Sequence, residues 1–353
     1  MQSHNRTAIA IGLGSVAICV AFVAITERNR KAHPAGPLDA VPAGALLVGT
    51  ADVAALRASP LGAPLFKQGR EIAGLGKVRD VCGFDPLDGL AEVAIAIPAG
   101  GDTGEFGLVA TGAIDDEAIL GCASRLIEAR GGKPIVAPLG GFRSVHDANQ
   151  TAGSGEIAVR KGGPLLLGGG DYLRSMVDAA EGRAATVQTS VAHGFLGNEV
   201  GDSTARITVV LSPEQRKTLS QELAAGGQSG SPLGSIVAGG AGIKVGPTVS
   251  VHGVLSCENA GTCVDLANTL KAARDARAQD LTTKMVGLGS VFEKLDIQAK
   301  GPAVHVRIEL PAEEATALVD KILTLRGMRH PTASPDETAM PRKPPPPVLD
   351  QKK

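Results

Sequence analysis

The sequence contains the same pattern twice, and this duplication constrains the fold more than any other feature. Residues 106–129 (FGLVATGAIDDEAILGCASRLIEA) resemble residues 249–273 (VSVHGVLSCENAGTCVDLANTLKAA), and the alignment places Cys122 on Cys263. Further matches, including a Gly-Pro pair in each copy, follow in the same order along the chain. Several matches in one order indicate an internal repeat.

Each copy predicts strands joined by hairpins, with helices between them. Short runs such as 93–97 and 108–114 have the small and β-branched residues of buried strands. Hairpin-linked strands with helices gathered to one side are typical of an α+β fold. We therefore predict two similar domains, 45–185 and 203–327, each with a largely antiparallel sheet and helices packed on one face.

The two ends of the chain differ from the body in composition, and they predict a membrane span and a disordered tail. Residues 7–26 contain no charge and would form about 30 Å of helix, the thickness of a bilayer core. A cleaved signal peptide is the alternative, but the apolar run is longer than usual and no small-x-small site directly follows it. We predict one uncleaved transmembrane helix within 1–31, a Pro/Gly-rich linker over 32–44, and a disordered Pro-rich tail over 328–353.

Four cysteines lie outside the predicted span. Cys257 and Cys263 are close enough in sequence to bond across a short loop, which leaves Cys82 for Cys122. Residues six apart in a helix lie about 9 Å apart along its axis, so Cys257 must stand outside the helix that holds Cys263. Four buried thiols are the alternative. We favour the two disulfides and hence an oxidising compartment.

The charges beside the predicted span point the other way. Arg28, Arg30 and Lys31 follow it, and the positive-inside rule would place the body in the cytoplasm. We give the cysteines more weight. The sequence then predicts a single-pass protein of the inner (cytoplasmic) membrane with its body in the periplasm.

The stretch PLLLGGGDYLR combines a strand, glycines and the start of a helix, as phosphate-binding loops do. The second copy has Glu309, Leu310 and Pro311 at the same junction, and no lysine follows the glycines of the first. We therefore interpret Gly168–Gly170 as a turn, with Asp171 as the candidate N-cap of the next helix.

The acidic run Asp115–Glu117 offers the ligands of a metal site. Its counterpart is Ser256–Glu258, so the shared feature is a capping residue followed by an acid in the first helical turn. We interpret Asp115 and Ser256 as N-caps and assign no metal ligand.

Ser144, His146 and Asp147 are the candidates for hydrolytic chemistry. A strand places Ser144 and His146 on one face and Asp147 on the other, whereas catalytic triads assemble from distant segments. The sequence contains no HExxH, GxSxG, GxxxxGK[ST] or paired CxxC motif. We therefore assign no catalytic, cofactor-binding or metal-binding residue and expect no cofactor.

Composition excludes one class of partner. Lys and Arg number 35 against 36 Asp and Glu, and aromatic residues make up 2% of the chain. Nucleic-acid binding needs a positive field or stacking surfaces, and this chain has neither.

The stretches CGFDPLDGLAEVAIAIP and GEIAVRKGGPLLLG, together with the layout, resemble membrane-anchored bacterial proteins that carry one duplicated α+β unit. The resemblance covers most of residues 1–327 and implies no activity and no site residue. We expect a non-enzymatic envelope protein that acts through protein contacts or a ligand, with a protein partner in the envelope. The alternatives are an extracytoplasmic hydrolase near Ser144 and His146, and a redox protein that uses CENAGTC.

Overall fold

The computed structural model forms two compact units, Met1–Ala312 and Glu313–Lys353. The residues that the structure describes are 36–62, 75–100, 105–149, 155–227, 230–285 and 287–325. The predicted span 7–26 and the tail 328–353 lie outside them. None of the described helices has the length and apolar character needed to cross a membrane.

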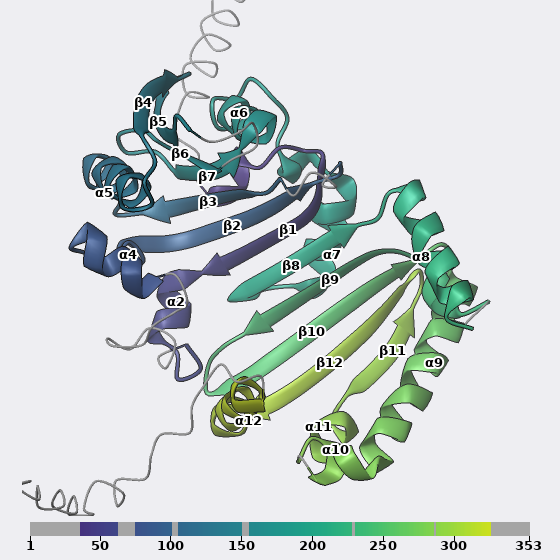
Figure 1. Cartoon of the computed structure of the whole chain (residues 1–353). Coiled ribbons are helices and arrows are strands. Elements are labelled where there is room, and N and C mark those ends of the chain that lie inside the picture. The colour runs from purple at the N-terminus through teal and green to yellow at the C-terminus, as the bar shows by residue number, and fades with distance from the viewer. Residues whose placement is uncertain are drawn as a thin grey trace, which may run out of the picture. The chain divides into compact units, whose positions relative to one another are not determined.

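The first half of the body begins with the short helix η1 (Pro37–Ala40) and ends with helix α6 (Figure 1). Its elements are β1 (Ala45–Asp52), α2 (Val53–Ala58), α4 (Leu75–Cys82), β2 (Leu90–Pro98), β3 (Gly107–Gly112), α5 (Asp116–Ala129), β4 (Pro134–Leu139), β5 (Phe142–Asp147), β6 (Gly155–Val159), β7 (Leu165–Gly169) and α6 (Gly170–Ala180).

The second half begins with the short helix η3 (Val187–Thr189) and helix α7 (Val191–Val200). There follow β8 (Ala205–Val210), α8 (Pro213–Ala225), η4 (Pro232–Ser235), β9 (Ile236–Lys244), β10 (Thr248–Cys257), α9 (Ala260–Gln279), α10 (Leu281–Met285), α11 (Gly289–Glu293), β11 (Asp296–Lys300), β12 (Ala303–Pro311) and α12 (Ala312–Leu325).

All twelve of these strands form one sheet, in the order β11-β12-β10-β9-β8-β1-β2-β3-β7-β6-β5-β4. The order β1-β2-β3-β7-β6 in the first half repeats as β8-β9-β10-β12-β11 in the second, so the two halves share a topology. The hairpin β4–β5 extends the first half only. The prediction of a largely antiparallel α+β fold is confirmed.

The prediction of two separate sheets was wrong. Strands β1 and β8, the first of each half, pair antiparallel from Leu47 opposite Val209 to Ala51 opposite Ala205. Each strand would otherwise present a row of unpaired backbone groups at a sheet edge. Pairing with its counterpart satisfies those groups and merges the two sheets.

Helices cover both faces of the sheet, which corrects the expectation of one covered face. In β6, Ala158 belongs to the core cluster that contains Leu173 of α6, whereas the next residue, Val159, belongs to the cluster that contains Ile119 of α5. Consecutive residues of a strand point to opposite faces, so α6 and α5 pack on opposite sides. In β12, Ala303 and Val304 divide in the same way between the clusters of α7 and α9.

Two segments interpreted as connections are part of the packed body. Within the predicted linker 32–44, Ala40 and Val41 are fully buried, and the backbone N–H of Val187 donates to the Val41 carbonyl. Between the predicted domains 45–185 and 203–327 lies α7, whose Leu196 and Val200 are buried. Burial of these apolar side chains stabilises segments whose prolines, glycines and polar residues suggested loops.

Local caps explain where several helices begin. The carboxylate of Asp52 accepts from the N–H of Ala55 before α2, and that of Asp115 accepts from the N–H of Ala118 before α5. Asn259 accepts from the N–H of Thr262 before α9. These side chains satisfy N–H groups that have no partner within the helix.

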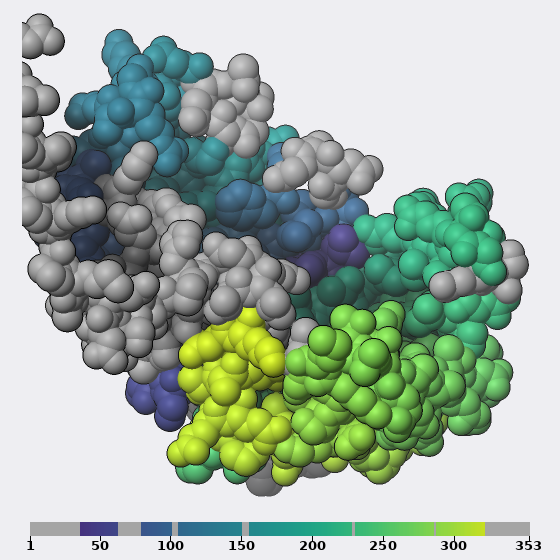
Figure 2. Space-filling view, turned by 60° about the horizontal axis from the view of Figure 1, so that its bottom comes forward, coloured from purple at the N-terminus to yellow at the C-terminus, as the bar shows by residue number. Residues whose placement is uncertain are grey.

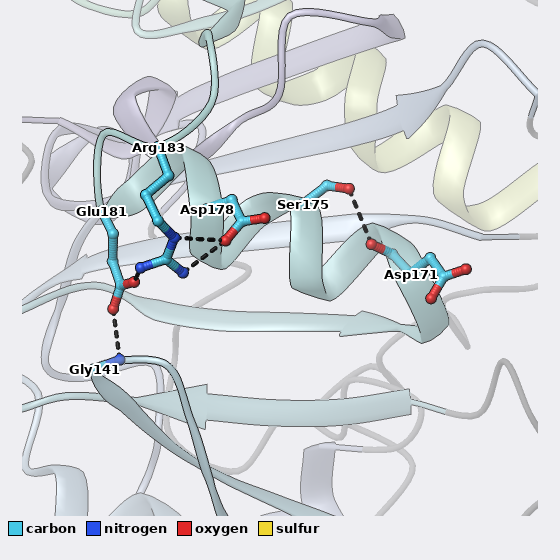
Figure 3. A network of polar contacts seen from close by, with 6 residues as sticks. All are labelled: Gly141, Asp171, Ser175, Asp178, Glu181 and Arg183. Atoms are coloured by element: carbon cyan, nitrogen blue, oxygen red, sulfur yellow. Dashed lines mark hydrogen bonds and ion pairs between the residues drawn. The ribbon is translucent and has the colours of Figure 1, made fainter.

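The hairpin β4–β5 is held to the end of α6 by a polar network (Figure 3). Glu181 accepts from the N–H of Gly141 in the hairpin turn at 2.5 Å, and Arg183 pairs with both Glu181 and Asp178. A Cβ atom at Gly141 would lie 2.6 Å from the Glu181 carboxylate. The glycine therefore allows the close approach that closes this contact.

Helix α9 packs against the sheet through one of its sides only. Its buried residues Cys263, Leu266, Ala267 and Ala278 recur at helical spacing, and residues between them, such as Val264, are exposed. Figure 2 shows the outward surface of this region in green. In the second unit, α12 carries Glu313 and Glu314 in its first turn, which the N-terminal end of a helix favours.

Candidate functional site

A cavity of about 230 Å³ lies where the two halves meet. Strands β1 and β8 contribute Val48, Thr50, Arg206 and Thr208, whose side chains share one face of the sheet. The remaining walls come from η1, η3 and α7 and include Leu38, Val187, Gln188, His193, Gly194, Gly197 and Asn198. We call this cavity the junction pocket; it requires residues of both halves.

His193 fixes α7 above the junction. The ring is buried, with Nδ1 2.8 Å from the Thr208 hydroxyl and Nε2 3.0 Å from the Ala45 carbonyl oxygen. A carbonyl can only accept, so we assign the tautomer in which Nε2–H donates to Ala45 and Nδ1 accepts from Thr208. Both ring nitrogens are then used in hydrogen bonds that tie α7 to β1 and β8.

Arg206 is the charged residue of the junction pocket. It is half-buried, and its guanidinium lies beside α7, where a Cβ atom at Gly197 would stand 3.1 Å from Nη1. No residue of the described ranges forms an ion pair or hydrogen bond with the Arg206 side chain. The nearby Asp39 is already bonded to the Gln188 side chain at 2.6 Å and to the N–H of Gly36 at 3.1 Å.

Two glycines of α7 leave space over the pocket. Gly194 and Gly197 are three residues apart and both line it, as the helical repeat requires for one face. Neither has a positive φ. Within the described chain, a Cβ atom at Gly194 would meet nothing within 4 Å. Neither backbone conformation nor close packing therefore requires glycine at position 194.

A second, more polar cavity of about 180 Å³ lies on the second half and includes Ser250, His252 and Arg307. His252 Nε2 is 3.1 Å from His305 Nδ1, and His305 Nε2 is 3.5 Å from the Glu199 carboxylate. Burial lowers the pKa of both histidines, and the neighbouring positive charge of Arg307 acts in the same direction. The described residues contain no cluster of three or more His, Cys, Asp or Glu side chains suited to a metal ion.

Both predicted disulfides are present. Cys82 at the end of α4 pairs with Cys122 of α5, with Cα atoms 4.8 Å apart. Cys257 pairs with Cys263 at a Cα separation of 5.6 Å, and Cys257 ends β10, outside α9, as the spacing required. The two helical cysteines are not equivalent in detail, because Cys122 follows its N-cap by two helical turns and Cys263 by one.

The structure does not join Ser144 and His146 into a catalytic pair. The buried Ser144 hydroxyl donates to the carbonyl of Ala137 on β4, at 3.4 Å. His146 Nδ1 lies 3.7 Å from the carboxylate of Glu156 on β6. Asp147 accepts from the N–H groups of Lys133 and Asn149, which close the ends of the hairpin.

The other candidates have structural roles, with two corrections. Asp115 is an N-cap as predicted, but in the second half the cap is Asn259, and Ser256 lies within β10. Gly168–Gly170 form the end of β7 and the start of α6, where Gly169 is the N-cap and Asp171 lies in the first turn. The cap of α9 lies three residues later than predicted, because β10 continues through Cys257, and the cap of α6 lies two residues earlier, because the helix begins at Gly170.

Arg206 could not be singled out by its own residue type, since a lone arginine in a strand is common on protein surfaces. The sequence feature that could have indicated the pocket is the pair of glycines in HGFLGN. Each glycine inside a helix costs about 1 kcal/mol of stability. That stretch was interpreted as a boundary, where glycines need no explanation.

Comparison with known proteins adds little. No protein-family model matches the chain, and no curated protein sequence matches it. Among solved structures, it is similar to TP0453 in crystal form III, with 13% identity and a TM-score of 0.46 over 80% of this chain and 97% of that one. Crystal form I of TP0453 gives 13% identity and a TM-score of 0.42, over 80% and 96%. Similarity at this level says nothing about function.

Proposed function

We propose that the chain is a non-enzymatic envelope protein, tethered to the inner membrane by residues 7–26, whose body binds a small ligand in the junction pocket. The observation that carries this proposal is the composition of the pocket. It combines an arginine without a described partner, neutral polar side chains and apolar walls, as small-molecule sites do.

The two disulfides support the proposed location. Disulfides persist in oxidising compartments and are rare in the cytosol, and the chain outside 7–26 has both of its cysteine pairs at bonding distance. A body in the periplasm, next to the inner membrane, would be accessible to periplasmic small molecules and to envelope proteins.

The hydrolase alternative has no comparable support. A serine nucleophile needs a base within hydrogen-bond reach, and the Ser144 hydroxyl donates instead to a backbone carbonyl. The redox alternative needs an exposed thiolate, whereas Cys257 and Cys263 are buried and bonded.

Binding is tested with the full-length protein in detergent, incubated with a small-molecule extract of bacterial cells and separated from unbound compounds. Mass spectrometry should find compounds retained by the wild type and lost in Gly194→Leu, whose side chain would occupy the junction pocket. The control, Gly121→Leu, changes a helical glycine of α5 away from the pocket and should retain them. Equal retention by all three proteins would sink the binding proposal.

The location is tested separately. Carbonate washing should leave the protein in the membrane fraction, and protease added to spheroplasts should degrade the body. Protection of the body until the membrane is lysed would place it in the cytoplasm.

A further inference from the structure

We propose that the ligand of the junction pocket is a small monocarboxylate with a short apolar chain, and that Arg206 pairs with its carboxylate. This inference rests on the proposed function, because it assigns the chemical class of the ligand that the pocket binds.

The charge of Arg206 restricts what the junction pocket can bind. A half-buried guanidinium loses part of its hydration, which is costly unless an anion replaces the water. Asp39, which follows Leu38 of the pocket wall, is bonded to Gln188 and Gly36, and no carboxylate of the described residues pairs with Arg206. A guanidinium offers two parallel N–H groups that match the two oxygens of a carboxylate.

The number of positive charges in the junction pocket limits the charge of the ligand. Arg206 is the only Lys or Arg among the described residues that line the pocket. The remaining donors include the neutral Asn198 and Gln188 amides and the Thr50 and Thr208 hydroxyls. One positive charge balances a monocarboxylate, whereas a phosphate dianion would remain half-neutralised in a partly desolvated site.

The size and lining of the junction pocket limit the uncharged part of the ligand. The cavity of about 230 Å³ is smaller than the roughly 300–1,000 Å³ of pockets for drug-sized ligands. Leu38, Val48 and Val187 give it apolar walls, which would bury a short hydrocarbon chain but offer few partners to the hydroxyl groups of a sugar.

The wall that α7 contributes to the junction pocket is open at Gly194. Glycine in a helix costs about 1 kcal/mol relative to alanine, and position 194 has room for a side chain. A glycine that lowers helix stability and is not required by packing is explained if a ligand occupies the space beside it. Gly197 lies on the same face of α7, beside the Arg206 guanidinium.

The experiment uses the full-length protein in a non-ionic detergent and measures binding of butyrate by calorimetry and by saturation-transfer NMR. Butanol, butylammonium and inorganic phosphate are the comparison probes. We expect butyrate to bind at least tenfold more tightly than each of them. Arg206→Gln should remove this preference, and Arg206→Lys should retain part of it, because the charge remains while the paired N–H geometry is lost.

Gly194→Leu should weaken butyrate binding at least tenfold while Gly121→Leu leaves it unchanged, and thermal unfolding of each variant checks that it is folded. Butyrate binding that is equal in the wild type and Arg206→Gln would overturn the assignment, as would tighter binding of phosphate or butanol. If extract compounds are retained in a pocket-dependent way but butyrate does not bind, the carboxylate assignment fails and the binding function stands. If nothing depends on the pocket, both fail.

Discussion

Val48 and Thr208 lie opposite one another in the β1–β8 pair, and they occupy equivalent positions in the two halves. Each stands four residues before the N-cap of the following helix, Asp52 for α2 and Ser212 for α8. An approximate two-fold axis therefore passes between them. The junction pocket lies beside this axis, but its walls differ, because α7 covers one half and the shorter η1 covers the other.

The stability of the protein should fall as the pH drops from 7.5 to 5.5. Burial lowers the pKa of His252 and His305 below the ordinary value, so below about pH 6.5 the unfolded chain binds protons that the folded protein does not. The stability contributed by the neutral pair is thus present above that value and lost as the pH falls toward the folded pKa. Urea unfolding across this range measures the effect.

Glu199→Gln should steepen this pH dependence, since the Glu199 carboxylate raises the pKa of both histidines. Glu222→Gln removes a carboxylate from α8, away from the pair, and serves as the control. A urea midpoint of unfolding that rises as the pH falls would contradict the stabilising role of the neutral His252–His305 pair.

The two disulfides should differ in their contribution to stability. Cys82 and Cys122 close a loop with a sequence separation of 40, against 6 for Cys257 and Cys263. The loop-entropy relation gives about 4 kcal/mol for the longer loop and about 2 kcal/mol for the shorter. Paired serine substitutions, compared by urea unfolding, should show the larger loss for Cys82 and Cys122; the reverse order would reject loop entropy as the main source.

Asn259→Ala should destabilise the protein by about 1 kcal/mol, because it removes the hydrogen bond to the N–H of Thr262. Ser256→Ala is the matched control: its hydroxyl makes one 3.5 Å contact with the Pro302 carbonyl, and we expect less than about 0.5 kcal/mol. A larger loss of stability in Ser256→Ala than in Asn259→Ala would place the N-cap of α9 at Ser256, as the sequence alone had suggested.

Gly107→Ala should cost about 1–3 kcal/mol. Its Cβ atom would lie 2.4 Å from Met176 Sδ and 2.7 Å from the Tyr172 ring, so α6 would have to move away from β3. Gly155→Ala in β6 is the control, because a Cβ atom there meets nothing within 4 Å. Equal thermal stability of the two variants would show that α6 packs less closely than the structure has it.

Features that depend on short segments could be predicted from the sequence. The strand content of 93–97, the cap at Asp115 and the position of Cys257 outside its helix each follow from neighbouring residues and the fixed geometry of helices and strands. The shared strand order followed from the repeat. Errors arose where the partner is distant: whether Val41 is buried, and whether α7 is a helix or a boundary, depends on side chains far along the chain.

The candidate site illustrates the same division. The sequence by itself determined the duplication and the α+β class, because matched segments fold alike. It also placed Cys257 outside the helix of Cys263 if the two bond, because a helix cannot bring residues six apart to bonding distance. Only the tertiary structure decided that the halves share one sheet, because backbone groups at a strand edge can pair with any strand of suitable register. That pairing places Arg206 beside Gly194 and Gly197 of α7, and no local pattern encodes where two halves meet.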